Sequence, residues 1–255
     1  MKEIESAFLQ KQVRPLERFL LGLPLGRLFT GILYTIHNHL LEKLDLEDFG
    51  NGRLSLSSAE VGRMFMAPDE SVVSVLRLSE QDDFTPAGFN VKSDNEFVQE
   101  GKPVVVVAYQ DIDGPGLRLD SLHLARVMLI PDAPARFCTA AFGLMACTAN
   151  RHGFKKITLF AGGNGPPPEQ EEEGDLVGYM VWPKFGFDAE LIPADLNLEP
   201  RLSHCRSVLE VTRFDSCWWE QHGRGREMWF DLAPSSRSWK VLLNYIYVAL
   251  AGSAQ

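Results

Sequence analysis

The sequence lacks the patterns that would place it in a familiar functional class at once. Four cysteines lie far apart and form no Cys-x-x-Cys pair, namely Cys138, Cys147, Cys205 and Cys217. This spacing argues against a zinc finger or a dense disulfide framework, and we expect reduced thiols. Basic residues are also scarce, since 25 Lys and Arg stand against 34 Asp and Glu, for a net charge of −9. A nucleic-acid-binding protein needs a basic surface, so we expect no nucleic-acid partner.

Long uncharged apolar runs are missing as well. The most apolar window, residues 19–41, contains Arg27, His37, Asn38 and His39. A membrane-spanning helix needs about 20 largely uncharged apolar residues, so we expect no membrane span. The N-terminal segment MKEIESAFLQKQ has no apolar signal core. Together with the reduced cysteines, this predicts a cytoplasmic protein.

Sequence motifs for metal or nucleophile chemistry are weak. The six histidines are scattered, and His37 and His39 would face different directions on a helix, so we expect no metal site. Cys205 follows His204, but neighbouring residues on a strand point to opposite faces, so we do not expect a catalytic thiol. The glycine-rich AGGNG segment, residues 161–165, lacks the Lys-Ser/Thr of a P-loop and is interpreted as a turn.

The composition is that of an ordinary globular chain, with 255 residues, 45% hydrophobic and 23% charged. Apolar spacing of i, i+3, i+4 and i+7 predicts a helix over residues 25–44. Ser57 and Glu60 are spaced as a capping box and predict the start of another helix. Further helices are expected over residues 3–21, over 132–154 and from Ser235 or Ser236 onward.

Apolar and β-branched runs predict a sheet. Strands are expected over residues 71–79, 103–110, 121–131, 155–163 and 207–214, and an aromatic strand pair over 178–191. The run PVVVVAYQ is the most continuous, so we expect a central strand covered on both faces. Breaks are expected at 48–52, 80–100 (loop or a short helix), 113–116 and 164–175. The pattern predicts an α/β (α+β) fold in which helices cover a mixed sheet.

The order of elements from 121 to 190 resembles the GNAT superfamily, the acyl-CoA-dependent N-acetyltransferases. Val127 to Asp132 resembles the strand exit of that family, Arg136 to Arg151 its cofactor-binding helix, and His152 to Ile157 the start of the next strand. The stretch WPKFGF, residues 182–187, resembles its aromatic-x-x-hydrophobic-Gly-Phe signature. The resemblance covers roughly a third of the chain and implies an acyl-CoA cofactor, in particular acetyl-CoA.

The resemblance also implies site residues. The cofactor would contact Leu129, Ile130, Ala135, Arg136, Phe137, Cys138, Thr139 and Trp182. The sequence departs from the family pattern here, because both glycines of the family's phosphate cradle are absent and Phe137 adds bulk. Helix amides and the charge of Arg136 are then expected to hold the pyrophosphate.

The catalytic residues implied by the resemblance are fewer. The family often has a tyrosine that protonates the leaving thiolate, and here Trp182 stands in its place. Tyr179, three residues away, is the candidate substitute. A base must take the proton of the amine, and Asp120 and His123 are the candidates by position. A turn aspartate and an ordinary strand histidine are the alternative interpretations of these two residues.

Three parts are expected: a helical N-terminal extension (1–49), a GNAT-like core (50–195) and a C-terminal strand-helix segment (196–255) packing on it. The first hypothesis is N-acyl transfer to a small-molecule or protein amine. The alternative is a catalytically inactive GNAT-like scaffold that acts through protein–protein contact, by homodimerisation or through a partner at the N-terminal helices. A second alternative is an effector-like or toxin-like protein whose added helices address a target.

Overall fold

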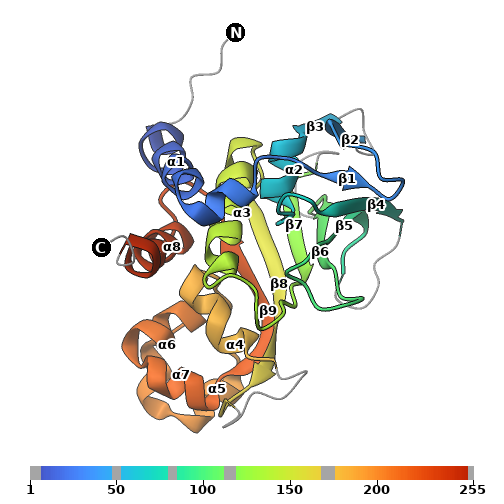
Figure 1. Cartoon of the computed structure of the whole chain (residues 1–255). Coiled ribbons are helices and arrows are strands. Elements are labelled where there is room, and N and C mark those ends of the chain that lie inside the picture. Colours follow the sequence, from blue (N-terminus) through green and yellow to red (C-terminus); the bar gives the residue numbers. More distant parts are fainter. Residues whose placement is uncertain (1–6, 48–52, 80–84, 112–118, 168–175, 252–255) are drawn as a thin grey trace.

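The computed structural model describes residues 7–47, 53–79, 85–111, 119–167 and 176–251. A seven-stranded mixed sheet runs through the molecule, and helices cover one of its faces (Figure 1). The α/β fold class predicted from the sequence is therefore confirmed, while membership of the GNAT superfamily stays a prediction. Predicted breaks at 48–52 and 113–116, and most of the one at 164–175, lie outside the described residues.

The strands of the large sheet lie in the order β1-β4-β5-β6-β7-β8-β9. Their bounds are β1 Tyr34–Thr35, β4 Val72–Leu78, β5 Gly88–Asp94, β6 Val104–Tyr109, β7 Ser121–Arg126, β8 Lys156–Asn164 and β9 Arg224–Asp231. A separate antiparallel hairpin consists of β2 Lys43–Glu47 and β3 Arg53–Ser57. Within the large sheet β1 pairs with β4, and β7 with β8, in parallel, and the other neighbours are antiparallel.

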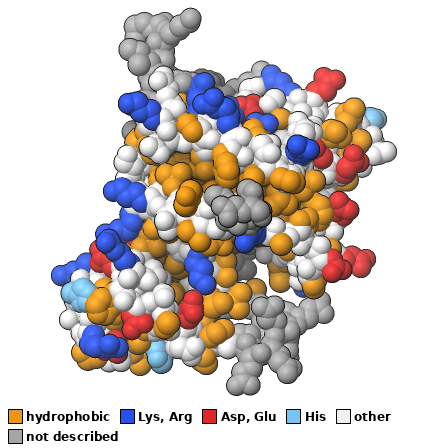
Figure 2. Space-filling view, turned by 60° about the vertical axis from the view of Figure 1, so that its left-hand side comes forward, with side chains coloured by type: hydrophobic (Ala, Val, Ile, Leu, Met, Phe, Trp, Pro, Cys, Tyr) orange, Lys and Arg blue, Asp and Glu red, His pale blue; other side chains and the backbone are white. Residues whose placement is uncertain are grey.

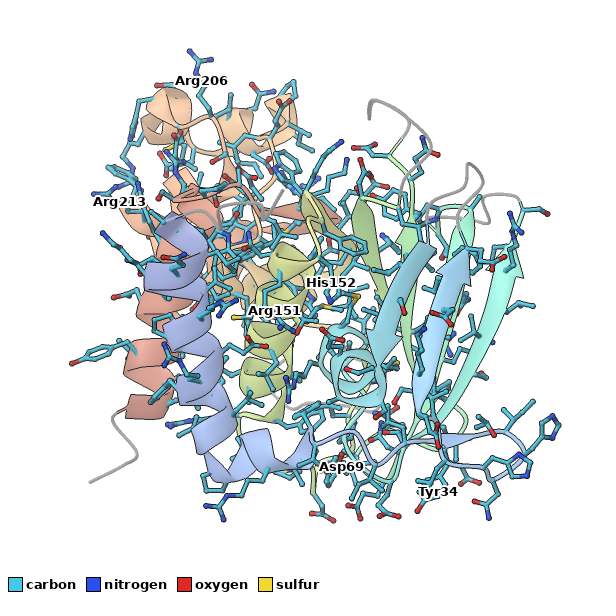
Figure 3. All side chains as sticks on the ribbon, turned by 90° about the horizontal axis from the view of Figure 1, so that it is seen from above. Tyr34, Asp69, Arg151, His152, Arg206 and Arg213 are labelled. Carbon is cyan, nitrogen blue, oxygen red and sulfur yellow. The ribbon has the colours of Figure 1, made fainter. Side chains whose placement is uncertain are left out.

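Helices occur before, between and after the strands along the chain. The α-helices are α1 Arg14–Gly22, α2 Ser58–Met64, α3 Phe137–Arg151, α4 Gly178–Val181, α5 Pro193–Leu198, α6 Val208–Phe214, α7 Ser216–His222 and α8 Arg237–Ile246. Short 3₁₀ or π turns are η1 Leu9–Val13, η2 Pro24–Leu28, η3 Trp182–Phe185, η4 Pro200–His204 and η5 Tyr247–Ala251. Seen from above, α1, α8 and α3 lie on one side of the sheet (Figure 3).

The core lies between α3 and the sheet. α3 is rich in small residues, so it approaches the strands closely and twelve of its fifteen residues are buried. Phe142 projects from α3 onto Phe187 and Phe230, with ring centroids 5.1 and 5.4 Å away. Trp239 of α8 packs on the same Phe230 at 5.4 Å. These contacts join α3, β9 and α8 into one hydrophobic cluster.

Several predicted elements are confirmed. Strands near 71–79, 103–110 and 155–163 are present, and Ser57 and Glu60 form the predicted capping box at α2. The last helix is capped by Ser236, whose hydroxyl accepts from the amide of Trp239. The helix predicted over 3–21 is present as η1 and α1, although residues 1–6 lie outside the described part.

The helix predicted over residues 25–44 is wrong. Gly31 and Asn38 have φ values of +101° and +59°, which a right-handed helix does not accommodate. The carboxylate of Asp69 accepts hydrogen bonds from the amides of Gly31 and Ile32 at 2.8 and 3.0 Å, and it holds an extended chain there (Figure 3). The helical periodicity was misleading, because Ile36 and Leu40 are exposed instead of forming a buried stripe.

Other boundaries differ for equally local reasons. The predicted loop at 80–100 contains strand β5, the predicted strand at 207–214 is helix α6, and β7 and α3 are shorter than predicted. The aromatic strand pair predicted over 178–191 is instead α4 and η3, ended by Gly186 at φ +93°. An added Cβ on Gly186 would lie 2.4 Å from the carbonyl oxygen of Ser238, so this turn requires glycine.

Candidate functional site

Strands β7 and β8 separate after a short parallel stretch. They pair only from Ser121 with Lys156 to Leu124 with Leu159, and α3 connects them. β8 continues to Asn164 along β9, whereas β7 ends at Arg126 after an irregularity in its pairing with β6. The two strands therefore diverge at the end where α3 begins, as Figure 1 shows.

The chain leaving β7 is held from the side away from β8. The carbonyl of Met128 accepts from the amide of Gln99 at 3.0 Å, and the amide of Ile130 donates to the carbonyl of Phe97 at 3.0 Å. Leu129 lies between these bonds, opposite Val98. Because successive residues of an extended chain present their backbone groups to opposite edges, the amide of Leu129 points toward β8. The carbonyl of Leu129 is 3.4 Å from the side-chain amide of Gln99.

The first turn of α3 lies at the surface beside this divergence. Arg136 precedes the helix in a left-handed conformation, φ +67°, and both Ala135 and Arg136 are exposed. The Phe137 side chain does not cover the helix end, because it is buried between Phe29 and Phe97 at 5.8 and 5.2 Å.

Two amides of this first turn donate to backbone carbonyls. The amide of Phe137 donates to the carbonyl of Pro134, and that of Ala140 to the carbonyl of Arg136. The amides of Cys138 and Thr139 belong to the first turn of α3, and the residues four positions before them lie outside the helix, so neither amide has an acceptor within it. Thr139 is buried and Cys138 half-buried, and burial raises the pKa of the Cys138 thiol to about 11.

Trp182 and Tyr179 lie behind α3, in the hydrophobic core. The ring of Trp182 packs on Phe142, Phe185 and Phe187 at 5.3 to 6.3 Å. Tyr179 is fully buried, and its hydroxyl donates to the carbonyl of Glu220 at 2.6 Å. Burial raises the pKa of Tyr179, so its proton is held in this bond.

Asp120 has a structural environment. Its carboxylate pairs with the ammonium of Lys155 at 2.6 Å and accepts from the amide of Asp111 at 2.9 Å. Burial raises the pKa of Asp120, but these bonds and one from Ser121 outweigh burial and lower it. The carboxylate therefore joins the start of β7 to the start of β8, as expected for a turn aspartate.

His123 differs from the other candidates, because only Nδ1 of its ring has a hydrogen-bond partner among the described residues. Nδ1 lies 2.9 Å from the hydroxyl of Thr158, and that hydroxyl lies 3.3 Å from the carbonyl of Leu122 and 3.3 Å from the hydroxyl of Tyr109. If Thr158 donates to the carbonyl, it accepts from Nδ1–H, and the lone pair is on Nε2. Burial lowers the pKa of His123 to about 4, so the ring is neutral at pH 7.

The sheet face that carries His123 also presents exposed aromatic residues. His123 pairs with Thr158 and Thr158 with Trp229, so all three share one face. In the next row Phe160 pairs with Glu227. Phe160 and Trp229 remain 43% and 39% exposed, which is unusual for rings on a central sheet. Sequence reasoning missed this row, although the alternation in KITLFAGG already places Thr158 and Phe160 on one face.

A large open cavity lies elsewhere, between α6, α7 and α8 and next to η3, with a volume of about 1340 Å³. Cys205 and His204 line it, with Sγ and Nε2 3.6 Å apart. The prediction that the two side chains diverge is wrong, because they end a 3₁₀ turn instead of occupying a strand. Burial nevertheless raises the pKa of Cys205, so the thiol stays protonated and is a poor nucleophile.

All four cysteines are free. Within the described ranges, no group of three or more His, Cys, Asp or Glu side chains is arranged to hold a metal ion. Among those same residues, no helix has both the length and the apolar character needed to cross a membrane.

Comparison with known proteins adds no assignment to this geometry. No family model, curated protein or solved structure matches the chain.

Proposed function

We propose that the chain binds an acyl-CoA at the divergence of β7 and β8 and transfers the acyl group to an amine. One observation carries the proposal: two parallel neighbouring strands, joined through a buried helix, stop pairing beside the exposed start of that helix. Where two such strands separate, backbone amides at the edge of one strand and at the start of the helix have no partner in the sheet or the helix. An extended amide-containing chain that ends in a pyrophosphate needs both sets of donors.

The cofactor would use main chain more than side chains. The amide of Leu129 points toward β8 and would bond to the pantetheine part. The amides of Cys138 and Thr139 and the charge of Arg136 would hold the pyrophosphate at the start of α3. The missing glycines are compatible with this arrangement, because Phe137 turns inward and leaves the helix end uncovered.

Bound acyl-CoA would supply a thioester, whose acyl group would pass to the amine nitrogen as a C–N bond replaces the C–S bond. A base of this chain would take the proton that the amine nitrogen loses, and CoA would leave as the free thiol with a proton from solvent. His123 is the candidate for the base by its position, and its Nε2 carries a lone pair when Nδ1–H donates to the hydroxyl of Thr158. Asp120 and Tyr179 are assigned to structural bonds instead.

The acceptor would approach on the sheet face that carries His123. Trp229 and Phe160 offer aromatic faces, and Glu227 offers an exposed carboxylate in the adjoining row. Aromatic rings and a carboxylate together attract a cationic amine. This favours a positively charged aliphatic amine as the acceptor class.

Isothermal titration with acetyl-CoA tests cofactor binding. We expect a measurable heat at high micromolar cofactor, and we expect Arg136→Glu to weaken binding about tenfold, equivalent to about 1.4 kcal/mol. Lys92→Glu, an exposed charge reversal on β5, is the matched control and should bind normally. The absence of heat with the native chain would contradict the proposal.

A second function is favoured by a specific observation, namely that Tyr179 and Asp120 are both committed to structural bonds. A scaffold that has lost catalysis would keep such packing and act through contact with a partner. Release of free CoA, followed with a thiol reagent in the presence of aliphatic amines, separates the two functions. If the chain binds acetyl-CoA but releases no free CoA with any of the amines, the result would favour the scaffold function.

A further inference from the structure

The cavity between α6, α7 and α8 is separate from the proposed acyl-CoA site and has a different lining. Its lining residues come from η3, α6, α7 and α8, among other segments. In the view that brings this side forward, Lys and Arg side chains border areas of hydrophobic ones (Figure 2). Its volume of about 1340 Å³ exceeds the roughly 300–1,000 Å³ of ordinary small-molecule pockets.

The inner wall of this cavity is apolar. Trp219 and Leu209 are almost fully buried, and Pro183 lies beside them. The indole of Trp219 is held from behind, since its N–H donates to the carbonyl of Tyr179 at 2.9 Å. Phe214 and Val248, 53% and 66% exposed, extend the apolar surface toward the mouth. A wall of this kind binds an apolar chain or ring by removing it from water.

The mouth of the cavity is cationic although the whole chain carries a net charge of −9. Four basic residues line it, namely Lys184, Arg213, Arg237 and Lys240, together with two carboxylates, Glu210 and Glu220. Each carboxylate already has a partner. Arg237 pairs with Glu210 at 3.0 Å, and Lys184 with Glu220 at 3.2 Å.

This pairing leaves two cations in excess. Within the described residues, neither Arg213 nor Lys240 forms an ion pair, and both side chains are exposed. They come from different helices, α6 and α8, which border the cavity from two sides. Two unneutralised cations at the mouth of an apolar cavity attract an anion whose remaining body is apolar.

We propose that this cavity binds an amphipathic anion, with one carboxylate or phosphate held by Arg213 and Lys240 and a long apolar chain lying against Phe214 and Val248. The inference does not depend on acyl transfer at β7 and β8. Guanidinium and ammonium groups bind either head group, so the shared chemistry is a single-headed anionic lipid-like molecule. The protonated, buried thiol of Cys205 takes no covalent part.

Calorimetric titration with four dodecyl compounds tests the head group. Dodecanoate and dodecyl phosphate should bind, and the tighter of the two identifies the natural head group. Dodecylamine and dodecanol should bind at least tenfold more weakly, because the mouth repels a cation and gains nothing from a neutral group. Octanoate should also bind at least tenfold more weakly than dodecanoate, because fewer methylenes leave water.

Variants locate the site. Arg213→Glu combined with Lys240→Glu should weaken dodecanoate binding at least tenfold. Arg206→Glu is the matched control, because Arg206 is an exposed arginine of the same region and does not line the cavity (Figure 3). Thermal unfolding should show that all variants fold as the native chain does, since the altered side chains are exposed.

Three results would overturn the inference. Equal affinities for dodecylamine and dodecanoate would show that the basic residues do not select an anion. Unchanged dodecanoate binding by the double variant would show that the site lies elsewhere. No binding of either anion below its micellar concentration would also refute it. None of these results bears on acetyl-CoA binding, so the two proposals fail or succeed separately.

Discussion

At the residue scale, the same residue type can belong to a site or to the framework according to its partners. Asp120 directly precedes β7 and His123 lies on it, and by position in the sequence both are candidate bases. Asp120 is neutralised by Lys155, whereas His123 faces a hydroxyl and stays uncharged. Only spatial partners distinguish them, because Lys155 and Thr158 are 35 residues away along the chain.

His123 should make stability depend on pH. Burial lowers the pKa of its folded form to about 4 from the ordinary 6.5, so the unfolded chain binds the extra proton. The contribution of neutral His123 to the free energy of unfolding is fully present above about pH 6.5. It decreases as the pH falls toward 4, by about 3 kcal/mol in total. Urea unfolding at pH 7 and pH 4.5 should show this loss in the native chain and a smaller loss in His123→Gln. His39→Gln, which changes an exposed histidine, should behave as the native chain does.

At the element scale, capping residues predicted helix starts well, while apolar periodicity failed over residues 25–44. Ser57, Glu60 and Ser236 occupy the cap positions that their sequence spacing indicates. The apolar spacing over 25–44 failed because a left-handed glycine and the remote Asp69 carboxylate favour an extended chain. A capping side chain bonds to its own helix, so its effect does not depend on distant residues. The conformation of an apolar segment, in contrast, depends on the residues that pack against it.

Gly186 offers a test at this scale. We expect Gly186→Ala to destabilise the fold by about 2–4 kcal/mol, because it adds a left-handed strain of about 1–3 kcal/mol and a clash with the Ser238 carbonyl. Gly101→Ala is the matched control, since Gly101 also has a positive φ, +70°, but an added Cβ meets nothing within 4 Å. Denaturant unfolding should show a clearly smaller loss for Gly101→Ala. Equal losses would mean that the close approach to Ser238 is not what requires glycine.

At the scale of the whole molecule, distant segments are joined by the sheet and by one ion network. β1 and β9 come from the segments expected to flank the core, and both add strands to the large sheet. Around the end of α3, Arg151 lies 3.5 Å from Glu17 of α1 and 3.3 Å from Glu60 of α2 (Figure 3). His152 contacts the same Glu60 at 3.0 Å. The network therefore attaches α1 and α2 to α3.

Removing one carboxylate should loosen this attachment. Burial raises the pKa of Glu60, but hydrogen bonds from Ser57 and His152 outweigh it and lower the pKa to about 2. A lowered carboxyl pKa contributes stability that is present above about pH 4.5 and is lost as pH falls toward 2. We expect Glu60→Gln to cost about 2 kcal/mol at pH 7, as loss of a charged hydrogen bond does.

The measurement is urea unfolding of Glu60→Gln and the native chain at pH 7 and pH 3. The difference between the two proteins should shrink at pH 3, and hydrogen exchange should show faster opening of α1 and α2 in the variant. Glu100→Gln, an exposed change in a turn, is the control. A difference that is the same at both pH values would contradict the role given to the ionised carboxylate.

The sequence by itself determined the α/β class, the central strand at 103–110, the capped helices and the order of β7, α3 and β8. These features depend on burial and on hydrogen bonds between near neighbours, which residue types specify directly. Only the tertiary structure decided that Tyr179 and Asp120 bond to Glu220 and Lys155, that His123 lies beside Thr158, and that Arg213 and Lys240 line one cavity. Charge state and cavity lining depend on side chains brought together from distant segments, and no local spacing encodes those distances.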